Sequence, residues 1–416
     1  MRQITRKTLL YTEMTMDSAL NWNPLNLEQF LGHDGVEYPL ALQLGGCDPI
    51  KMGAAAYLAE SYGAYESINV NCGCPSNRAK KCGFGAELML EPETVRKIVH
   101  EMKRIVTHTE VTVKCRLGVT NRESWEELKV FIHAVSEGGV KHVIVHARTC
   151  ILSGLSPAQN RTIPPLRHDD VHKLVEEFPE MKFTINGGIR TFQEARDHLG
   201  WDNTDKNSGS SLLYCVKANK RVKIERADNA DVDSHKMQMQ KFPVHGVMIG
   251  REAYNNPFLF STADAEFFSQ ESSSEHDKRD IAAAAVPESM KCSRRKLLQD
   301  YIDYAVRCQE KKSYGSNLCN IMKPLHNFFN GCPDNGNQLY KRKLDGLLKA
   351  ETKKDNKAGH TGETVSRSEP QYSSPFERIV WTAVEDTVPQ SFLDCNFRLN
   401  ENAVKRIDEE SENVPG

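Results

Sequence analysis

The sequence contains no run of about 20 consecutive apolar residues, and its first residues, Met1 to Lys7, lack the apolar core of a signal peptide. These absences predict a protein that neither spans a membrane nor enters the secretory route, and we expect it in the cytoplasm. None of the 12 cysteines has a partner at Cys-x-x-Cys spacing, which favours free thiols over a disulfide framework or a zinc module. The 54 Lys and Arg nearly balance the 56 Asp and Glu, and a net charge of −2 argues against coating of nucleic acid by bulk electrostatics.

Between Leu9 and Tyr254 the chain has a repeating order of short β-rich runs and amphipathic helical segments. This order predicts parallel strands that are connected by single helices. Apolar residues recur at helical spacing in three of the connecting segments, within 95–106, 128–135 and 171–178. The seven predicted strands are Leu9–Tyr11, Leu40–Leu44, Ser67–Asn71, Val111–Cys115, His142–His146, Phe183–Asn186 and Val247–Ile249.

The starts of two predicted helices have the spacing of a capping box, in which a hydroxyl and a carboxylate satisfy backbone amides reciprocally. Ser124 precedes Glu127 by three residues, and Thr191 stands in the same relation to Glu194. We therefore expect helices to begin directly after Ser124 and after Thr191.

Polar or special residues follow nearly every predicted strand at its carboxyl end, from Glu13 and Gln43 to Gly250 and Arg251. An open α/β sheet concentrates its site at one switch point, whereas a (β/α)8 barrel brings the carboxyl ends of all strands to a single mouth. Polar and special residues at the carboxyl ends of seven strands therefore favour an α/β protein with a (β/α)8 TIM barrel. A closed barrel of this kind has eight strands, and one strand is missing from the count.

The composition divides the chain into four parts. We predict a barrel domain over 1–262 with a polar, exposed insertion at 202–242, a linker over 263–290, a helical domain over 291–350 and a largely disordered tail over 351–416. The helical domain holds 12 Lys and Arg against 5 Asp and Glu, a local net charge of +7. Such a patch fits a phosphate backbone, although a solvated helical surface has the same composition.

The sharpest local signal is the segment Asn71-Cys72-Gly73-Cys74-Pro75-Ser76, which continues a predicted strand. The proline ends the strand, and Cys74 would present a thiol at the barrel mouth. A thiol is a weak acid that can protonate a substrate carbon. From the residues alone, two small buried side chains remain an alternative, and a metal site would need more ligands than Cys82 provides. We expect no metal.

Ten short motifs occur in one order along the barrel segment. They are Leu10-Tyr11-Thr12-Glu13-Met14, Leu42-Gln43-Leu44-Gly45-Gly46, Asn71-Cys72-Gly73-Cys74-Pro75-Ser76, Phe84-Gly85-Ala86, Val113-Lys114-Cys115-Arg116, Val145-His146-Ala147-Arg148, Gly154-Leu155-Ser156-Pro157, Ile163-Pro164-Pro165-Leu166, Ile185-Asn186-Gly187-Gly188-Ile189 and Met248-Ile249-Gly250-Arg251-Glu252-Ala253-Tyr254. Together they closely resemble the tRNA-dihydrouridine synthases, and the Gly-Leu-Ser-Pro and Ile-Pro-Pro-Leu motifs are similar to those of the bacterial A-type branch. The resemblance covers residues 8–260 strongly and 294–350 weakly.

The resemblance implies a barrel that binds FMN at its mouth and a C-terminal helical domain that binds tRNA. The implied activity is the reduction of uridine to 5,6-dihydrouridine in the D-loop of tRNA, at positions 20 and 20a, with NADPH as the electron donor. Cys74 would protonate C5 of the uridine after a hydride has reached C6, and Cys72 would be structural. We expect a monomer whose partners are tRNA and NADPH.

The resemblance also assigns contacts to the flavin and the RNA. Lys114 would face the flavin N1 and C2 carbonyl, where an ammonium compensates the negative charge of the reduced form, although a solvated lysine is the alternative. A histidine satisfied within the barrel wall is the alternative for His146. The other implied flavin contacts are Gln43 and, around the phosphate, Asn186, Gly187, Gly188, Gly250 and Arg251, and the implied uridine or tRNA contacts are Asn71, Arg148 and Lys323.

The start of the chain departs from the family pattern. In the family a strand with a Pro-Met pair precedes the motif of Leu10, but only nine residues precede Leu10 here. We expect that truncation has removed the first strand and its helix, and an organelle-targeting peptide could have been lost with them.

Two other functions stay open: an FMN barrel oxidoreductase of a pyrimidine-like small molecule, similar to dihydroorotate dehydrogenase, and an inactive tRNA-binding protein. The basic helical domain disfavours the first, and flavin absorbance of the purified chain would exclude the second.

Overall fold

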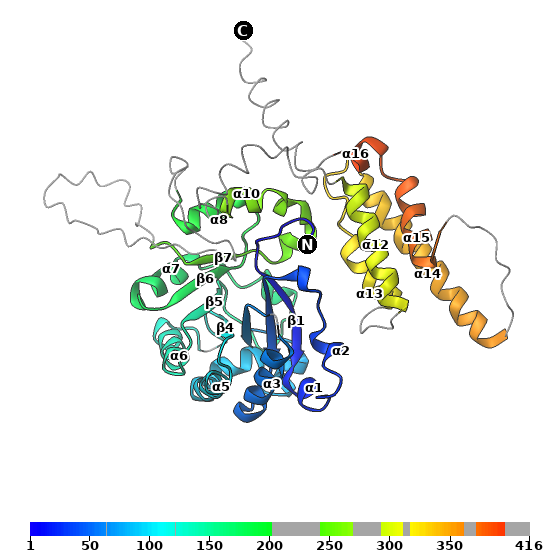
Figure 1. Cartoon of the computed structure of the whole chain (residues 1–416). Helices are drawn as coiled ribbons and strands as arrows, with labels where there is room; N and C mark the ends of the chain where they lie inside the picture. The colour runs from blue at the N-terminus through cyan, green and yellow to red at the C-terminus, as the bar shows by residue number, and fades with distance from the viewer. Residues whose placement is uncertain are drawn as a thin grey trace, which may run out of the picture.

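The computed structural model describes residues 1–63, 65–120, 122–201, 242–268, 293–310, 317–361 and 372–395. Within these residues one parallel sheet of seven strands curls in sequence order, from β1 at one edge to β7 at the other (Figure 1). Each of the seven predicted strands is present, and the fold class is confirmed as a TIM-barrel architecture with a helical C-terminal region. The strands are β1 (Leu10–Met16), β2 (Leu40–Gly45), β3 (Ser67–Cys72), β4 (Glu110–Arg116), β5 (His142–His146), β6 (Lys182–Asn186) and β7 (Gly246–Met248).

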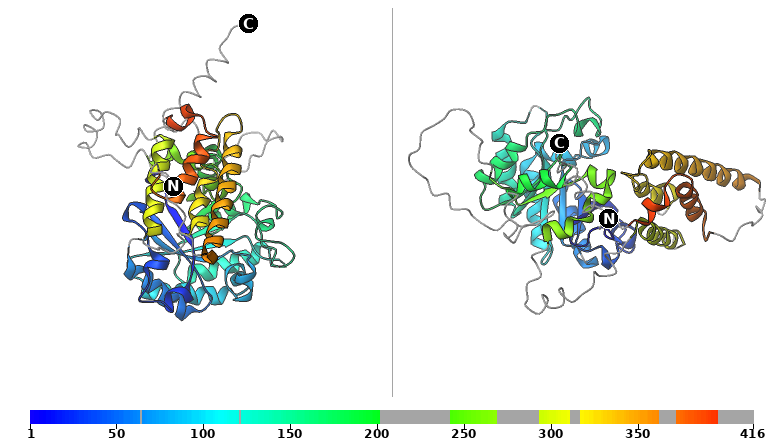
Figure 2. Two further views of the ribbon diagram at one scale, coloured as in Figure 1. Left: turned by 90° about the vertical axis from the view of Figure 1, so that its right-hand side faces the viewer. Right: turned by 90° about the horizontal axis from the view of Figure 1, so that it is seen from above.

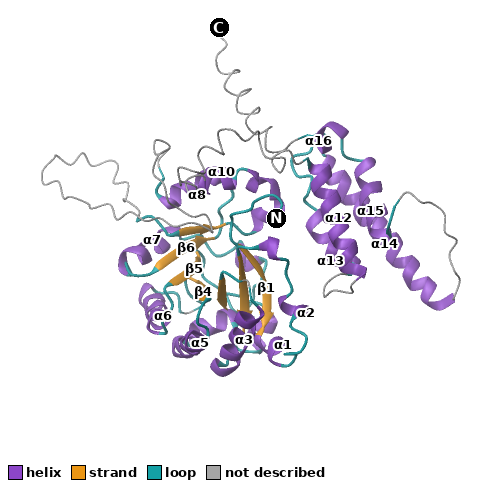
Figure 3. Ribbon diagram, viewed as in Figure 1, coloured by secondary structure: helices purple, strands orange, loops and turns teal. Residues whose placement is uncertain are grey.

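Helices cover the convex side of the curled sheet, while the strands line its interior (Figure 3). The inner strands are largely buried on both faces, as in β5, where all five residues are buried, whereas the edge strand β1 is only partly buried. Helices follow the strands in the expected alternation. Those of the barrel are α1 (Asp17–Asn21), α2 (Glu28–Leu31), α3 (Pro49–Tyr62), α4 (Asn77–Lys81), α5 (Pro92–Ile105), α6 (Trp125–Glu137), α7 (His168–Glu177), α8 (Phe192–Leu199), α9 (Arg251–Asn255) and α10 (Ala263–Phe268), with 3-10 turns η1 (Gly35–Glu37), η2 (Gly85–Leu90), η3 (Gln159–Arg161) and η4 (Pro257–Ser261).

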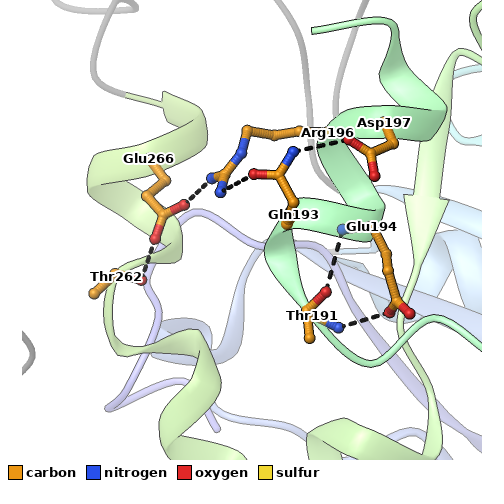
Figure 4. A network of polar contacts seen from close by, with 7 residues as sticks. All are labelled: Thr191, Gln193, Glu194, Arg196, Asp197, Thr262 and Glu266. Carbon is orange, nitrogen blue, oxygen red and sulfur yellow. Dashed lines mark hydrogen bonds and ion pairs between the residues drawn. The ribbon is translucent and has the colours of Figure 1, made fainter. Parts of the chain in front are cut away.

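Both predicted capping boxes are present. The hydroxyl of Ser124 accepts from the amide of Glu127 at the start of α6, and Thr191 does the same for Glu194 at the start of α8, with the carboxylates returning to the cap amides. Figure 4 shows the second box beside Arg196, whose guanidinium pairs with Glu266 and so joins α8 to α10. The expected linker over 263–290 therefore begins too early, because α10 buries Phe267 and Phe268 against the barrel.

Residues 1–8 form no strand and do not complete the barrel. They run from the start of β1 to α10, where the carboxylate of Asp264 accepts hydrogen bonds from the Thr5 hydroxyl and from the amides of Arg6 and Lys7, at 2.7, 2.7 and 3.1 Å. Among the described residues β1 pairs only with β2, and β7 pairs only with β6. The predicted insertion lies almost wholly outside the described residues.

The C-terminal region is a cluster of helices beside the barrel (Figure 2). It contains α12 (Arg294–Glu310), α13 (Leu318–Met322), the 3-10 turn η6 (Lys323–Leu325), α14 (Gly336–Thr361), α15 (Pro375–Glu385) and α16 (Gln390–Asp394). The expectation of a disordered tail over 351–416 is wrong for α15 and α16, because these helices bury apolar residues such as Phe376, Val380 and Leu393. The helical cluster therefore extends beyond the predicted boundary at 350.

Arg294 joins the barrel to α16. Its guanidinium carbon lies 4.5 Å from the ring centroid of Phe258 in η4 and 4.2 Å from that of Phe392 in α16. Phe258 also meets Phe328 of the helical cluster edge to face, with ring centroids 5.3 Å apart. No helix in the described part of the chain combines the length and the apolar character that a membrane crossing requires.

Candidate active site

A cavity of about 550 Å³ opens at the carboxyl ends of the strands. This size lies within the range of small-molecule and cofactor sites. The structure brings ten of the twelve predicted site residues to its wall, and only Arg148 and Lys323 are not among them. The ten are Gln43, Asn71, Cys74, Lys114, His146, Asn186, Gly187, Gly188, Gly250 and Arg251.

Asn71 holds the cysteine turn in place from the end of β3. Its Oδ1 accepts the backbone amides of Gly73 and Cys74 at 3.1 and 2.9 Å, an arrangement that turns the chain sharply after the strand. Its Nδ2 donates to Oε1 of Gln43 at 2.7 Å, and Gln43 in turn donates to Oδ1 of Asn69 at 2.9 Å. Because Asn71 serves both neighbours, one side chain sets the relative positions of Cys74 and Gln43.

The carbonyl group of Cys74 is fixed by the motif Phe84-Gly85-Ala86. The amide of Ala86 donates to that oxygen at 3.0 Å. Gly85 has a φ of +69°, and a Cβ built on it would lie 2.6 Å from the same oxygen, so a side chain is excluded there. The loop that leaves Cys74 therefore closes back on it, and the half-buried thiol is held at the cavity wall.

Lys114 is a half-buried cation in the cavity wall. Its Nζ donates to Oδ1 of Asn186 at 3.0 Å, and Asn186 donates through Nδ2 to the carbonyl oxygen of Met248 at 2.8 Å. Burial, and secondarily the charge of Arg116, lowers the pKa of Lys114 to about 8. The ammonium thus lies among neutral partners, where a negative group would be strongly attracted.

His146 is neutral in this site. Burial, followed by the nearby charges of Lys114 and Arg116, lowers its pKa to about 2. The ring packs so closely on Gly187 that a Cβ there would lie 2.5 Å from Cδ2 of His146. An uncharged imidazole here offers a hydrogen bond and a flat face rather than a charge.

Arg116 is a site residue to which sequence reasoning assigned no role. Its buried guanidinium donates to the carbonyl oxygens of Gly73, Thr149 and Asn160, at 3.0, 3.1 and 3.0 Å. It therefore ties the cysteine turn to the loops that follow β5. Its position two residues after Lys114 on the same strand was the available signal, because alternate residues of a strand share a face.

The remaining predicted residues lie elsewhere. Arg148 directs its guanidinium to the carbonyl oxygens of Thr162 and Pro164 and does not line the cavity. Lys323 lies in the helical cluster, where Nζ donates to Oδ1 of Asn320 at 2.6 Å. Cys72 is fully buried, and burial raises the pKa of its thiol.

The model of one protein family, described as "Dihydrouridine synthase (Dus)", matches residues 1–205 and 220–362 of this chain. The chain belongs to the dihydrouridine synthase family. Among curated relatives, the tRNA-dihydrouridine(20/20a) synthase of Pseudomonas putida is 40% identical over 268 residues, which cover 64% of this chain and 66% of that protein. The protein of the same name from Synechocystis is 34% identical over 333 residues, which cover 80% of each chain.

Membership in the dihydrouridine synthase family confirms the resemblance carried by the ten motifs. It makes the chain a flavin-dependent oxidoreductase by family.

Proposed function

We propose that this dihydrouridine synthase binds FMN in the cavity at the barrel mouth and uses NADPH to reduce uridine to 5,6-dihydrouridine in the D-loop of tRNA, at positions 20 and 20a. The observation that carries the proposal is the placement of Cys74 and Lys114 on the wall of one cavity that ends at Gly187 and Gly188. The names of the curated relatives support the choice of tRNA position.

The residues present fit a flavin mononucleotide. Nζ of the half-buried Lys114 donates to the neutral side-chain oxygen of Asn186, and an ammonium held by a neutral group suits the electron-rich edge of a flavin. Gln43 offers an amide at a neighbouring strand end. The glycine turn at Gly187 and the guanidinium of Arg251 suit a phosphate group, since backbone amides and arginine are its common ligands. FMN, when bound, supplies the hydride chemistry.

The chain's own residues orient the uridine and move one proton. The hydrogen bonds of Asn71 and Gln43 hold both side chains at the cavity wall. We assign to them the orientation of the pyrimidine by hydrogen bonds. Cys74 delivers the proton that C5 of the uridine needs once C6 has received a hydride, because a thiol is acidic enough to give it up to an enolate-like carbon. Arg116 keeps the cysteine turn in position for this transfer.

The basic helical cluster supplies RNA affinity. Its positive charges bind the phosphate backbone, and Lys323 and Arg148 are the contacts that we assign to tRNA. The chemistry requires the target uridine to leave its stack and enter the barrel mouth.

The test is a purified full chain assayed for bound flavin by absorbance near 450 nm and for dihydrouridine in unmodified tRNA with NADPH. We expect flavin to copurify and dihydrouridine to form at positions 20 and 20a. Bound flavin without tRNA reduction would contradict the assigned substrate. Tight tRNA binding without any flavin would instead indicate an inactive tRNA-binding protein.

A further inference from the structure

The glycine turn at the end of β6 is held tightly from one side. Gly187 and Gly188 have φ values of +109° and +82°, in the region that favours glycine. A Cβ on Gly188 would lie 2.5 Å from Cδ1 of Leu166, just as one on Gly187 would collide with His146. The turn therefore has no room for side chains, and its backbone is what it presents to the cavity.

From the other side the turn is held by His168, the first residue of α7. Nε2 of His168 donates to the carbonyl oxygen of Gly187 at 2.7 Å. In a trans peptide the carbonyl oxygen and the following amide hydrogen point in opposite directions. A bond that draws the Gly187 oxygen toward α7 consequently turns the amide of Gly188 away from α7, and Gly188 lines the cavity.

His168 is in turn supported by two further histidines. Its ring meets that of His198 edge to face with centroids 4.7 Å apart, and Nδ1 of His198 lies 3.0 Å from Nε2 of His172. His172 directs Nδ1 to the carbonyl oxygen of Phe242, at 2.6 Å. Carbonyl oxygens only accept hydrogen bonds, so Nε2 of His168 donates to Gly187 and Nδ1 of His172 donates to Phe242. The carbonyl oxygen of Gly187 therefore fixes Nε2 as a nitrogen of His168 that carries a hydrogen.

We propose that His168 is a positioning residue for the cofactor phosphate: it orients the Gly187–Gly188 peptide so that the Gly188 amide faces the phosphate of FMN. The inference rests on the proposed function, because it takes the cavity to be the FMN site. It adds a role for α7, whose His168 is not among the residues that line the cavity.

The test compares FMN with riboflavin, which lacks the phosphate. Dissociation constants of both are measured by fluorescence on the flavin-free full chain. His168→Leu fills the position with an apolar side chain and removes the hydrogen-bond donor, whereas His168→Gln retains an N–H donor at a similar position. His133→Leu on α6, at an exposed site away from the cavity wall, is the matched control.

We expect His168→Leu to weaken FMN binding by about tenfold, the size of one hydrogen bond, with riboflavin binding changed less than about twofold. His168→Gln and His133→Leu should match the wild type. The inference is overturned if His168→Leu leaves the ratio of the FMN and riboflavin dissociation constants unchanged, including the case in which it weakens both flavins equally. It is also overturned if His168→Gln fails to restore that ratio. A wild type that binds neither flavin would overturn the proposed function itself, whereas a normal wild type with an unmoved ratio overturns only the role of His168.

Discussion

Lys114 and Asn186 meet across the barrel mouth, where Nζ of the lysine donates to Oδ1 of the asparagine at 3.0 Å although β5 lies between their strands. Asn186 is itself anchored to the carbonyl oxygen of Met248 on β7. The position of the Lys114 ammonium is thus set by β4, β6 and β7 together. This arrangement holds the ammonium at the cavity wall, and in the part of the chain that the structure describes it forms no salt bridge that would neutralise it.

Cys74→Ala should leave flavin reduction by NADPH intact and abolish dihydrouridine formation, because the thiol serves only the protonation of C5. Bleaching of flavin absorbance measures the first half-reaction, and the dihydrouridine content of tRNA measures the second. Cys72→Ala is the control, since its buried thiol does not line the cavity. Normal turnover by Cys74→Ala would refute the assignment of the proton donor.

Flavin reduction should slow as the pH rises through about 8, because Lys114, with its pKa lowered to about 8, then loses the charge that compensates the reduced flavin. Stopped-flow reduction by NADPH between about pH 6.5 and 9.5 measures this rate. In Lys114→Gln the rate should be low and lack that transition. An identical pH profile in wild type and variant would assign the transition to another group.

The flavin-free protein should gain stability when Lys114 is replaced by methionine. The pKa of Lys114 is lower in the folded chain than in the unfolded chain, so the unfolded state binds more protons between about pH 8 and 10.5, and wild-type stability rises over that window. The free energy of unfolding of Lys114→Met should therefore exceed that of the wild type by on the order of 2 kcal/mol at pH 7. This difference should close toward pH 10.5. Denaturant titrations at both pH values measure it, and a gap that widens with pH would contradict the burial argument.

Asp264→Ala should destabilise the barrel by about 2 kcal/mol, because it removes an ionised acceptor from three donors of residues 5–7. The expected fall in the thermal midpoint is roughly 4 to 8 °C. Glu110→Ala, at an exposed position that begins β4, is the control. Equal midpoints for Asp264→Ala and the control would show that residues 1–8 do not stabilise the barrel edge.

Trp381→Ala should destabilise the helical cluster by about 3 kcal/mol, since the side chain is only 6% exposed and donates from Nε1 to Oε1 of Gln299 at 3.0 Å. Arg295 also lies over its ring, 5.4 Å from the centroid. Calorimetry of the full chain measures the loss, with the half-exposed Tyr304→Ala on α12 as the control. If Trp381→Ala left the stability of the full chain unchanged, the packing of Trp381 in α15 would contribute no stability.

Several features of this protein were determined by local sequence alone. The alternation of apolar runs located all seven strands, and the hydroxyl-to-carboxylate spacing located the starts of α6 and α8. The residues that end parallel strands were also expected to meet, because closure of such a sheet brings those ends together. That rule is why ten predicted residues share one cavity.

Other features depended on contacts between distant segments, which no local pattern encodes. The sequence around α15 and α16 is mostly polar, and their Trp381 and Phe392 pack against Arg295 and Arg294, which lie about 80 to 100 residues earlier in the chain. The roles of Arg116 and His168 likewise arise from carbonyl oxygens on other loops. A side chain's partner across space is selected by packing of the whole chain, so only the tertiary structure decided which polar groups hold the site in shape.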